Sequence, residues 1–390
     1  GLVACAGAGR VVGGVVRALT RGAFPEMFAA TQGGVPPWLS GLFICAVVLL
    51  YVFFGGLRGA AWANTFQTCV FMVTGLIAFV VISSKLGGLA AASERVLEAR
   101  PERLIRGEEI TQLQFLTYFF IPFSVGMFPH LFQHWLTARS AKTFRLTVVA
   151  HPIFIMVVWV PCILIGVWAT AAVMPDGSPV VPSGVPPNTE LAIMVQKLTG
   201  PLLAGLLGAG ILAAIMSSLD SQFFCLGTMF THDIVTHYFG EARFDDRSRV
   251  RLARCFIVGV VAVTYLLSLA QPRHVFTLGI WCFSGFASLF PLVFASIYWR
   301  GVTRAGALAS VVVTAAAWLL LFQAGDYGGD RGYLFLSMMP AATIFVCSLV
   351  TLVGVSLFTA PPSEKTLNKY FPRKQPGSTA VAAGAPVAGD

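Results

Sequence analysis

The sequence contains few charged residues. Only 11% of its 390 residues are Asp, Glu, Lys or Arg, whereas a soluble domain carries about 25%. So few charges do not cover a water-facing surface, and a soluble globular protein is therefore excluded. The rest of the chain is strongly apolar, with 56% hydrophobic residues and 32 phenylalanines. This composition is typical of a protein that faces lipid.

Several functional motifs are also missing. The eight cysteines are scattered and form no C-x-x-C pair, so neither a metal site nor a disulfide framework is predicted, and we interpret them as small apolar side chains. The net charge is +9, but no run of Lys and Arg resembles a nucleic-acid-binding patch, and we expect no nucleic-acid partner. The Ser and His residues show no nucleophile–base spacing, so we do not predict an enzyme.

The hydrophobic stretches have the length of membrane spans, which need about 20 mostly apolar residues. They are too long and continuous for the short strands of a barrel, so they are expected to be helices. The sequence therefore predicts an all-α integral membrane protein that crosses the cell membrane (inner or plasma membrane) many times, with the lipid bilayer as a partner. The nine stretches are 37–54, 61–86, 113–136, 147–174, 200–231, 252–271, 275–298, 305–324 and 335–358.

The two ends of the chain differ from this pattern. The chain begins at Gly1 inside an apolar, glycine-rich stretch, without a charged segment and cleavage site of the kind that signal peptides carry. We expect this start to lie within a helix of a longer protein. The predicted transmembrane domain covers residues 1–358, and the composition of 359–390 predicts a disordered tail.

Most of the charges lie between the predicted spans. The segment 240–254 contains five arginines, and 87–110 mixes acidic and basic residues. Alternate loops lie on opposite sides of a membrane, and the short loops on one side carry more Lys and Arg. We expect that side, which includes the C-terminal tail, to be cytoplasmic.

One predicted span carries a carboxylate. Asp220 lies within the apolar stretch 200–231, and an ionisable residue inside a span costs several kcal/mol unless it faces a cavity or a partner. Asp220 is therefore a candidate functional residue.

Hydroxyl groups surround this carboxylate. Ala214, Ser217, Ser218 and Ser221 share one helix face, and Asp220 lies on an adjoining edge of it. Hydroxyl, carbonyl and carboxylate oxygens are ligands for hard cations, and sodium is the commonest coupling ion of that kind. The alternative is that these serines bond to their own helix or join it to a neighbour, as serines in membrane helices often do.

Two further segments indicate local breaks. Gly55 and Gly56 lie between two predicted spans and permit a tight reversal. Asn64 then enters the next span, either as a functional residue or as a polar contact between helices.

A second break is expected within the span 113–136. Pro122, Gly126 and Pro129 interrupt it. The break either lines a cavity, as in many transporters, or is a simple kink. We interpret His130 as a hydrogen-bonded structural histidine, with a proton carrier as the alternative.

Four runs resemble segments of the sodium/solute symporter family, in the family's order and at plausible spacing. They are GGLRGAAWANTFQ, GMFPHLFQHWLTARSAKTFR, GILAAIMSSLDSQ followed by THDI, and YWRGVTRAGALAS. The resemblance implies a leucine-transporter-type bundle, a five-plus-five inverted repeat of core helices. It implies that the spans from 37–54 to 275–298 are core helices four to ten and that the first, partial helix is core helix three. Core helices one and two would then be missing, and the bundle would be incomplete at its N-terminus.

The resemblance also implies cation sites. The family's main sodium site matches Ala214, Ser217 and Ser218. A second site in some members uses further hydroxyls of the same helix and an Asp on core helix five. Those positions match Ser217, Asp220, Ser221 and Asn64, so the carboxylate is at 220 and not at 64. Either the acid has moved across the same pocket, or no second ion binds.

A solute site facing the broken helix is implied as well. Phe123, Ser124 and Phe128 are the nearest candidates, followed by Trp281 and Ser284 on core helix ten. The GMFPH run resembles members that carry amino acids, monocarboxylates or pantothenate. The expected function is sodium-coupled import of such a small-molecule solute by alternating access, with Na⁺ as coupling ion and no organic cofactor. The alternatives are a symporter-like sensor module and a proton-coupled carrier.

Overall fold

The computed structural model describes residues 13–107, 110–138, 140–185, 189–270, 275–330 and 332–371. Within them the chain is helical, apart from turns and two isolated β-bridges. The helices of the spans are α2 (Pro37–Lys85), α6 (Phe144–Ala169), α8 (Pro201–Met229), α10 (Asp246–Ala270), α13 (Arg304–Ala324), α14 (Pro340–Leu357) and the consecutive pair α11 (Val275–Ala287) and α12 (Phe290–Tyr298). The other helical segments are α3 (Gly88–Ala99), α4 (Gln112–Thr117), η3 (Tyr118–Met127), α5 (Pro129–Leu136), α7 (Glu190–Leu198), η6 (Phe230–Thr236), α9 (His237–Phe239) and α15 (Glu364–Tyr370).

The predicted spans are confirmed. In the described part of the chain, eight helical segments are long and apolar enough to cross a membrane, and a ninth span is formed by the bent pair 112–127 and 129–136. Each of the nine overlaps one stretch that the sequence predicted. Many large apolar side chains on their outer faces, such as Leu202 and Phe54, are exposed, as expected of surfaces that contact lipid.

The chain reverses direction at Gly56, as the two glycines predicted. Its φ of 54° and ψ of −153° interrupt α2, whose two arms cover 37–56 and 58–85. Phe53, at the end of the first arm, accepts a hydrogen bond from Arg254 of α10. In the second arm Asn64 contacts Ser221 of α8. A left-handed φ is available to glycine without a steric penalty, so this one residue forms the turn.

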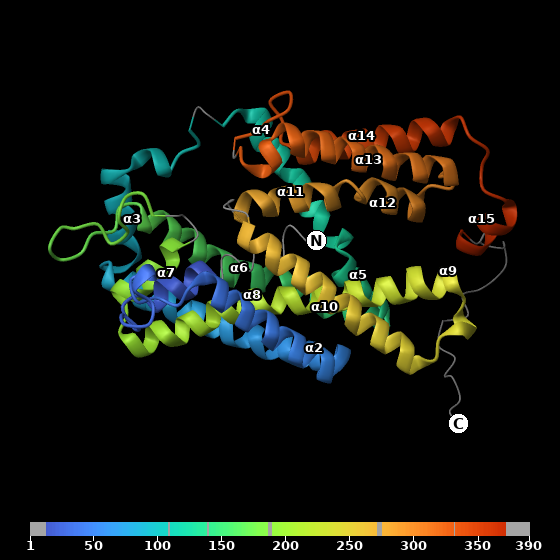
Figure 1. The fold of residues 1–390 in the computed structure, drawn as a ribbon. Helices are drawn as coiled ribbons and strands as arrows, with labels where there is room; N and C mark the ends of the chain where they lie inside the picture. Colours follow the sequence, from blue (N-terminus) through green and yellow to red (C-terminus); the bar gives the residue numbers. More distant parts are fainter. Residues whose placement is uncertain are drawn as a thin grey trace.

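Helix α8 lies at the centre of the bundle. One buried apolar cluster joins it to the second arm of α2, to α3, α6 and α7, and another joins it to the first arm of α2 and to α10. A third cluster packs α11 against α13 and α14. Figure 1 shows two groups of helices, with α2, α8 and α10 in one and α11 to α14 in the other, and the segment from α4 to α5 running between them. Helix α8, with the serines of its predicted cation-binding face, is therefore packed among several other helices.

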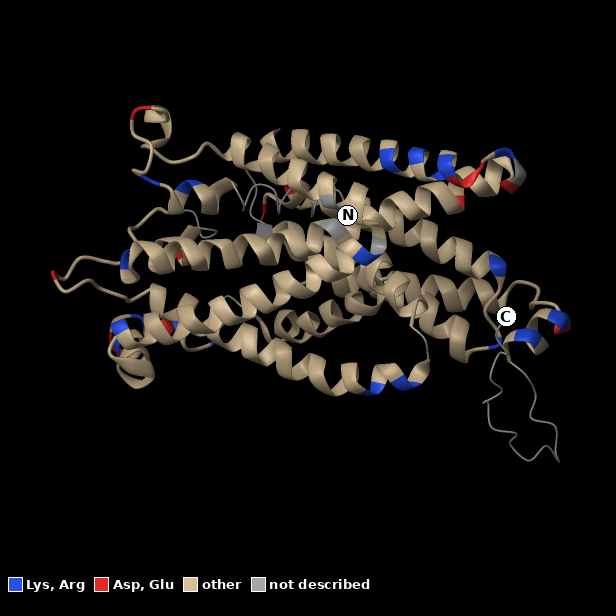
Figure 2. Ribbon diagram, turned by 90° about the horizontal axis from the view of Figure 1, so that it is seen from below, with Lys and Arg blue, Asp and Glu red and all other residues tan. Residues whose placement is uncertain are grey.

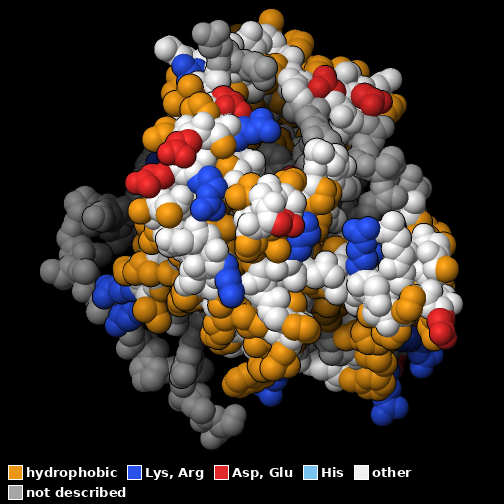
Figure 3. Space-filling view, turned by 90° about the vertical axis from the view of Figure 1, so that its left-hand side faces the viewer, with side chains coloured by type: hydrophobic (Ala, Val, Ile, Leu, Met, Phe, Trp, Pro, Cys, Tyr) orange, Lys and Arg blue, Asp and Glu red, His pale blue; other side chains and the backbone are white. Residues whose placement is uncertain are grey.

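Charged residues concentrate at the two ends of the bundle, and the middle is almost free of them (Figure 2). Figure 3 looks at the end that carries α3 and α7, where acidic and basic side chains are interspersed with apolar ones. The opposite end carries α9 and α15. This distribution is typical of a membrane protein whose two ends face water.

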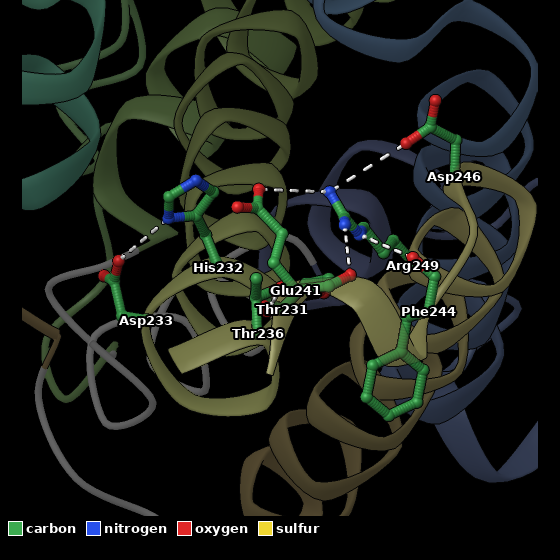
Figure 4. Close-up of polar contacts among 8 residues, drawn as sticks. All are labelled: Thr231, His232, Asp233, Thr236, Glu241, Phe244, Asp246 and Arg249. Carbon is green, nitrogen blue, oxygen red and sulfur yellow. Dashed lines mark hydrogen bonds and ion pairs between the residues drawn. The ribbon is translucent and has the colours of Figure 1, made fainter. Parts of the chain in front are cut away.

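The arginine-rich segment 240–254 has a structural role at that opposite end. The Arg249 guanidinium donates to the backbone carbonyls of Glu241 (2.7 Å) and Phe244 (3.1 Å) and lies 3.6 Å from the Glu241 carboxylate. Figure 4 shows these contacts closing the loop between α9 and α10. One of the arginines that suggested a cytoplasmic loop, Arg249, therefore also fixes the loop's shape.

Two segments differ from simple expectation. The end of the α8 span widens into a π-helix at 230–236, where the Thr236 hydroxyl donates to the Thr231 carbonyl five residues back (Figure 4). The predicted disordered tail begins with the short helix α15, which Ser363 caps. Residues 372–390 of that tail and residues 1–12, where the sequence predicts a partial first helix, lie outside the described residues.

Candidate functional site

The broken helix provides one wall of the site. The 3₁₀ segment η3 ends at Met127, Phe128 adopts an extended conformation with φ −67° and ψ 122°, and α5 starts at Pro129. The two halves are bent by 46°. Proline fits the first position of a helix, where its missing N–H is not needed. The break that the two prolines and the glycine predicted is confirmed.

A cavity of about 500 Å³ lies between the start of α5, the middle of α8 and α11. Its lining is apolar with a few polar groups. The residues are Val125, Phe128, Pro129, His130, Leu131, Ser218, Gln222, Cys225, Leu226, Gly279, Cys282, Phe283 and Phe286. No Asp, Glu, Lys or Arg is among these described lining residues. This size and composition are those of a small-molecule site. We call it the central cavity.

Aromatic rings form one side of the central cavity. The ring of Phe128 lies 4.8 Å from that of Phe286 and 5.6 Å from that of Phe283, between centroids. The imidazole of His130 lies 5.4 Å from the Phe128 ring. The central cavity thus has an apolar, polarisable surface next to the polar groups of His130, Ser218 and Gln222.

A second cavity, of about 330 Å³, lies along α8 nearer its N-terminal end. The second arm of α2, together with α6, α7 and α8, forms its almost wholly apolar wall, which includes Ala214 and Thr74. In this region Gly210 of α8 lies directly against the Thr74 side chain. The two cavities share no lining residue.

The predicted cation-binding face of α8 lies between these cavities. Helix α8 is continuous through this stretch, so the four residues do share a face. Ala214 lines the smaller cavity and Ser218, one turn later, lines the central cavity. Ser217 is half-buried and has its own polar partner.

The residues expected at a second cation site are in part brought together. The Asn64 amide nitrogen donates to the Ser221 hydroxyl at 2.7 Å, which links α2 to α8. The backbone of Asp220 lies within α8, but its side chain lies outside the described part of the structure. The side chains of Asn64 and Ser221 thus meet, through the amide nitrogen of Asn64 and the hydroxyl oxygen of Ser221.

One of the five predicted solute contacts lines the central cavity, namely Phe128. Phe123 instead packs against Phe290 and Phe345, with ring centroids 4.6 and 5.5 Å away. Ser124 is 1% exposed and does not line either cavity.

The two candidates on α11 also face away from the central cavity. Trp281 is 3% exposed and packs against Trp318 and Phe322 of α13, and its carbonyl accepts a hydrogen bond from the Trp318 indole at 2.8 Å. Ser284 is fully buried and donates to the Ile280 carbonyl in its own helix. This part of α11 joins the core to the last two spans.

Sequence reasoning did not select several residues that line the central cavity. Gln222 follows Ser218 by one helical turn, so the spacing rule for helix faces would have found it. Phe283 and Phe286 lie beside Trp281 and Ser284 in sequence, but on the other face of α11. His130 was interpreted as structural, whereas it lines the cavity.

Comparisons with known proteins agree with this architecture. The family model described as the sodium:solute symporter family matches residues 30–314. An osmoregulated proline transporter of Bacillus subtilis is 25% identical over 334 residues, which are 85% of this chain and 65% of the relative. A sodium/proline symporter of Staphylococcus aureus is 28% identical over 345 residues, which are 84% of this chain and 65% of the relative. The chain therefore spans slightly less than two thirds of the length of these relatives.

A solved structure shares the fold. It is described as a substrate-bound, outward-open state of a Na⁺-coupled sialic acid symporter with a novel Na⁺ site. The TM-score is 0.68 at 17% identity, and the alignment covers 93% of this chain and 75% of that one. The leucine-transporter-type fold expected from the sequence is thus confirmed.

Proposed function

Because the chain belongs to the sodium:solute symporter family, we propose that it provides the central cavity and the sodium-binding helix of a carrier that imports a small amino acid together with Na⁺. The observation that supports this most directly is the position of Ser218. Its hydroxyl belongs to the polar face of α8 and at the same time lines a solute-sized cavity beside a broken helix. Ion and solute would therefore bind within one turn of each other.

The coupling ion is assigned to Ala214, Ser217 and Ser218. Serine hydroxyls and a backbone carbonyl are neutral oxygen ligands, which suit a monovalent hard cation that must be released in every cycle. These three residues lie on one turn of α8, between the two cavities. Helix α8 is fixed on both sides by apolar clusters, so its ligands are held in place before the ion arrives.

A second cation is proposed near Asn64, Ser221 and Asp220. The hydrogen bond between Asn64 and Ser221 already joins two of these residues, and Asp220 is a carboxylate in the same turn of α8. Asp220→Asn is expected to remove the second ion from the transport cycle. The number of Na⁺ ions per solute, measured from reversal potentials in proteoliposomes, would remain unchanged if no second ion binds there.

The solute is proposed to be an amino acid of about the size of proline. The relatives are named as proline transporters and sodium/proline symporters, and a cavity of about 500 Å³ accommodates such a molecule with space for water. The rings of Phe128, Phe283 and Phe286 can contact an aliphatic ring, and an ammonium group is attracted to the faces of such rings. Of the residues predicted from sequence, Phe128 remains in this proposal.

Transport follows from coupled binding. Sodium on α8 favours the state in which the central cavity accepts solute, because a ligand shifts a conformational equilibrium only by its difference in affinity between the two states. The bend at Phe128 gives the two halves of the broken helix a point about which to move relative to each other. Low sodium on the inner side then releases the ion and, with it, the solute.

The test is uptake by proteoliposomes that contain the intact protein. An inward sodium gradient is imposed, and a panel of proline, other amino acids, monocarboxylates, pantothenate and sugars is offered. Sodium-dependent accumulation of proline supports the proposal. Accumulation that a proton gradient drives equally well without sodium would identify a proton-coupled carrier, and no uptake of any compound would favour the sensor module.

A further inference from the structure

The central cavity contains hydrogen-bond donors but no fixed charge among the described residues that line it. An amino acid carries a carboxylate, and burial of an ionised carboxylate without partners is costly. The side chains in the lining that donate hydrogen bonds strongly are those of His130, Ser218 and Gln222. Of these three side chains, only that of His130 comes from the start of α5.

His130 also lies at the start of a helix, where backbone N–H groups can bind an anion. It is the second residue of α5, directly after Pro129. The first backbone N–H groups of a helix have no partner within the helix, and the positive end of the helix dipole favours an anion there. At this end of α5 the Phe132 N–H donates to the Phe128 carbonyl at 3.0 Å. His130 and Leu131, whose N–H groups precede it, both line the cavity.

The other side of the cavity has the opposite character. On the side formed by α11, Phe283 and Phe286 present rings, and the Cys282 thiol is a weak hydrogen-bond donor. A carboxylate has no comparable partner on that side. The polar end of a solute is therefore directed to the start of α5 and its apolar end to the rings.

We propose that His130 is a specificity-determining residue that binds the carboxylate of the solute, together with the first turn of α5. This inference rests on the proposed function, because it assumes that an amino acid occupies the central cavity. It assigns a binding role to a histidine that the sequence alone suggested was structural. It also predicts that the carrier discriminates strongly between a carboxylic acid and its neutral amide.

The experiment compares L-proline with L-prolinamide, which differ only in the carboxylate. Binding of each to the intact protein in sodium is measured by displacement of radiolabelled proline, so that a variant which binds without transporting still gives a result. In the wild type we expect proline to bind at least about tenfold more tightly than the amide, as is typical for a hydrogen bond to a charged group.

His130→Leu is expected to reduce this discrimination by about tenfold, mainly through weaker binding of proline, with a smaller effect on prolinamide. His130→Gln, which keeps an N–H donor in a different position, should give an intermediate ratio. The matched control is His134→Leu, because His134 lies one turn later in α5 but does not line the cavity. Its ratio should equal that of the wild type.

The outcomes separate the two proposals. If the wild type binds proline in sodium but both His130 variants keep the wild-type ratio, the role of His130 is excluded while the proposed function stands. A loss that affects proline and prolinamide equally indicates structural damage and also overturns the inference. If the wild type binds neither compound in sodium, the proposed function itself fails and the inference fails with it.

Discussion

Helices α8 and α13 both place serines in an apolar sequence, but the surroundings of these serines differ. In α13 the Ser310 hydroxyl lies 3.0 Å from the Ser348 hydroxyl of α14 and 3.1 Å from its carbonyl, and both serines are 1% exposed. In α8 Ser218 is exposed to the central cavity. Serine in a membrane helix therefore joins helices where a partner helix is in contact and remains a candidate ligand where a cavity intervenes.

Small residues explain why α13 and α14 are in close contact. Gly306 lies directly against Ser356, and the backbone N–H of Thr303 donates to the Ser356 hydroxyl at 3.3 Å. Small residues permit the two backbones to approach closely. Around the middle of α8 the neighbouring elements are a bent helix and phenylalanine rings, which leave space beside the helix.

The strongest test of this difference is the alanine substitution of one serine from each helix. Ser218→Ala should lower the apparent sodium affinity by about 10- to 100-fold, since a buried cation loses an oxygen ligand, which is comparable to losing a hydrogen bond to a charge. Ser310→Ala is the control and should leave the sodium dependence unchanged. The sodium dependence of proline uptake is measured for both variants. Equal effects of the two substitutions would contradict the difference proposed between the serines of α8 and those of α13.

A second test addresses the close approach of α13 and α14. Gly306→Ala places a methyl group against Ser356, and such overpacking costs about 1–3 kcal/mol. Gly354→Ala is the matched control, because the space beside Gly354 in α14 is open. We expect a lower melting temperature in detergent for Gly306→Ala only. Equal melting temperatures would show that α13 and α14 are not tightly packed at Gly306.

A smaller effect is expected from the hydroxyl pair itself. Polar contacts between membrane helices contribute about 0.6 kcal/mol on average. A double-mutant cycle with Ser310→Ala and Ser348→Ala, evaluated from the free energy of unfolding, should give a coupling energy of this size. The same cycle with Ser218→Ala and Ser348→Ala should give none, because those serines lie in different groups of helices.

The smallest effect is expected at a water-exposed end of the bundle, where a carboxylate accepts hydrogen bonds at the start of α10. The Asp245 carboxylate accepts hydrogen bonds from the Ser248 side chain and from its backbone N–H at 3.2 Å, and these bonds lower the pKa of Asp245 below its ordinary value of 3.8. The stabilisation is therefore present above pH 3.8 and is lost as the pH falls through the lowered pKa. Amide hydrogen exchange of the first turn of α10 should accelerate, relative to its intrinsic rate, below that pH.

The variant Asp245→Asn provides the control for this last prediction. An amide side chain does not titrate in this range, so the protection of the first turn of α10 should then be independent of pH. The hydrogen bonds from Arg249 to the backbone carbonyls of Glu241 and Phe244 do not depend on a carboxylate and should hold the preceding loop in both forms. Protection that falls with pH in the variant as well would assign the effect to another group.

The sequence by itself determined the number and position of the nine spans and the family. It also predicted the reversal at Gly56 and the break near Phe128. These features are local, because a helix in lipid must satisfy its own backbone hydrogen bonds, and because glycine and proline change the backbone wherever they occur. The spacing of Ala214, Ser217, Ser218 and Ser221 likewise follows from helix geometry alone.

Only the tertiary structure decided which faces of these helices meet a cavity. Trp281 and Phe283 are two residues apart, yet Trp281 packs against α13 and Phe283 lines the central cavity. His130 and Ser218 come from segments far apart in the sequence and line the same space. Which face of a helix is covered depends on the neighbour that packs there, and packing between distant segments is not encoded in the periodicity of either one.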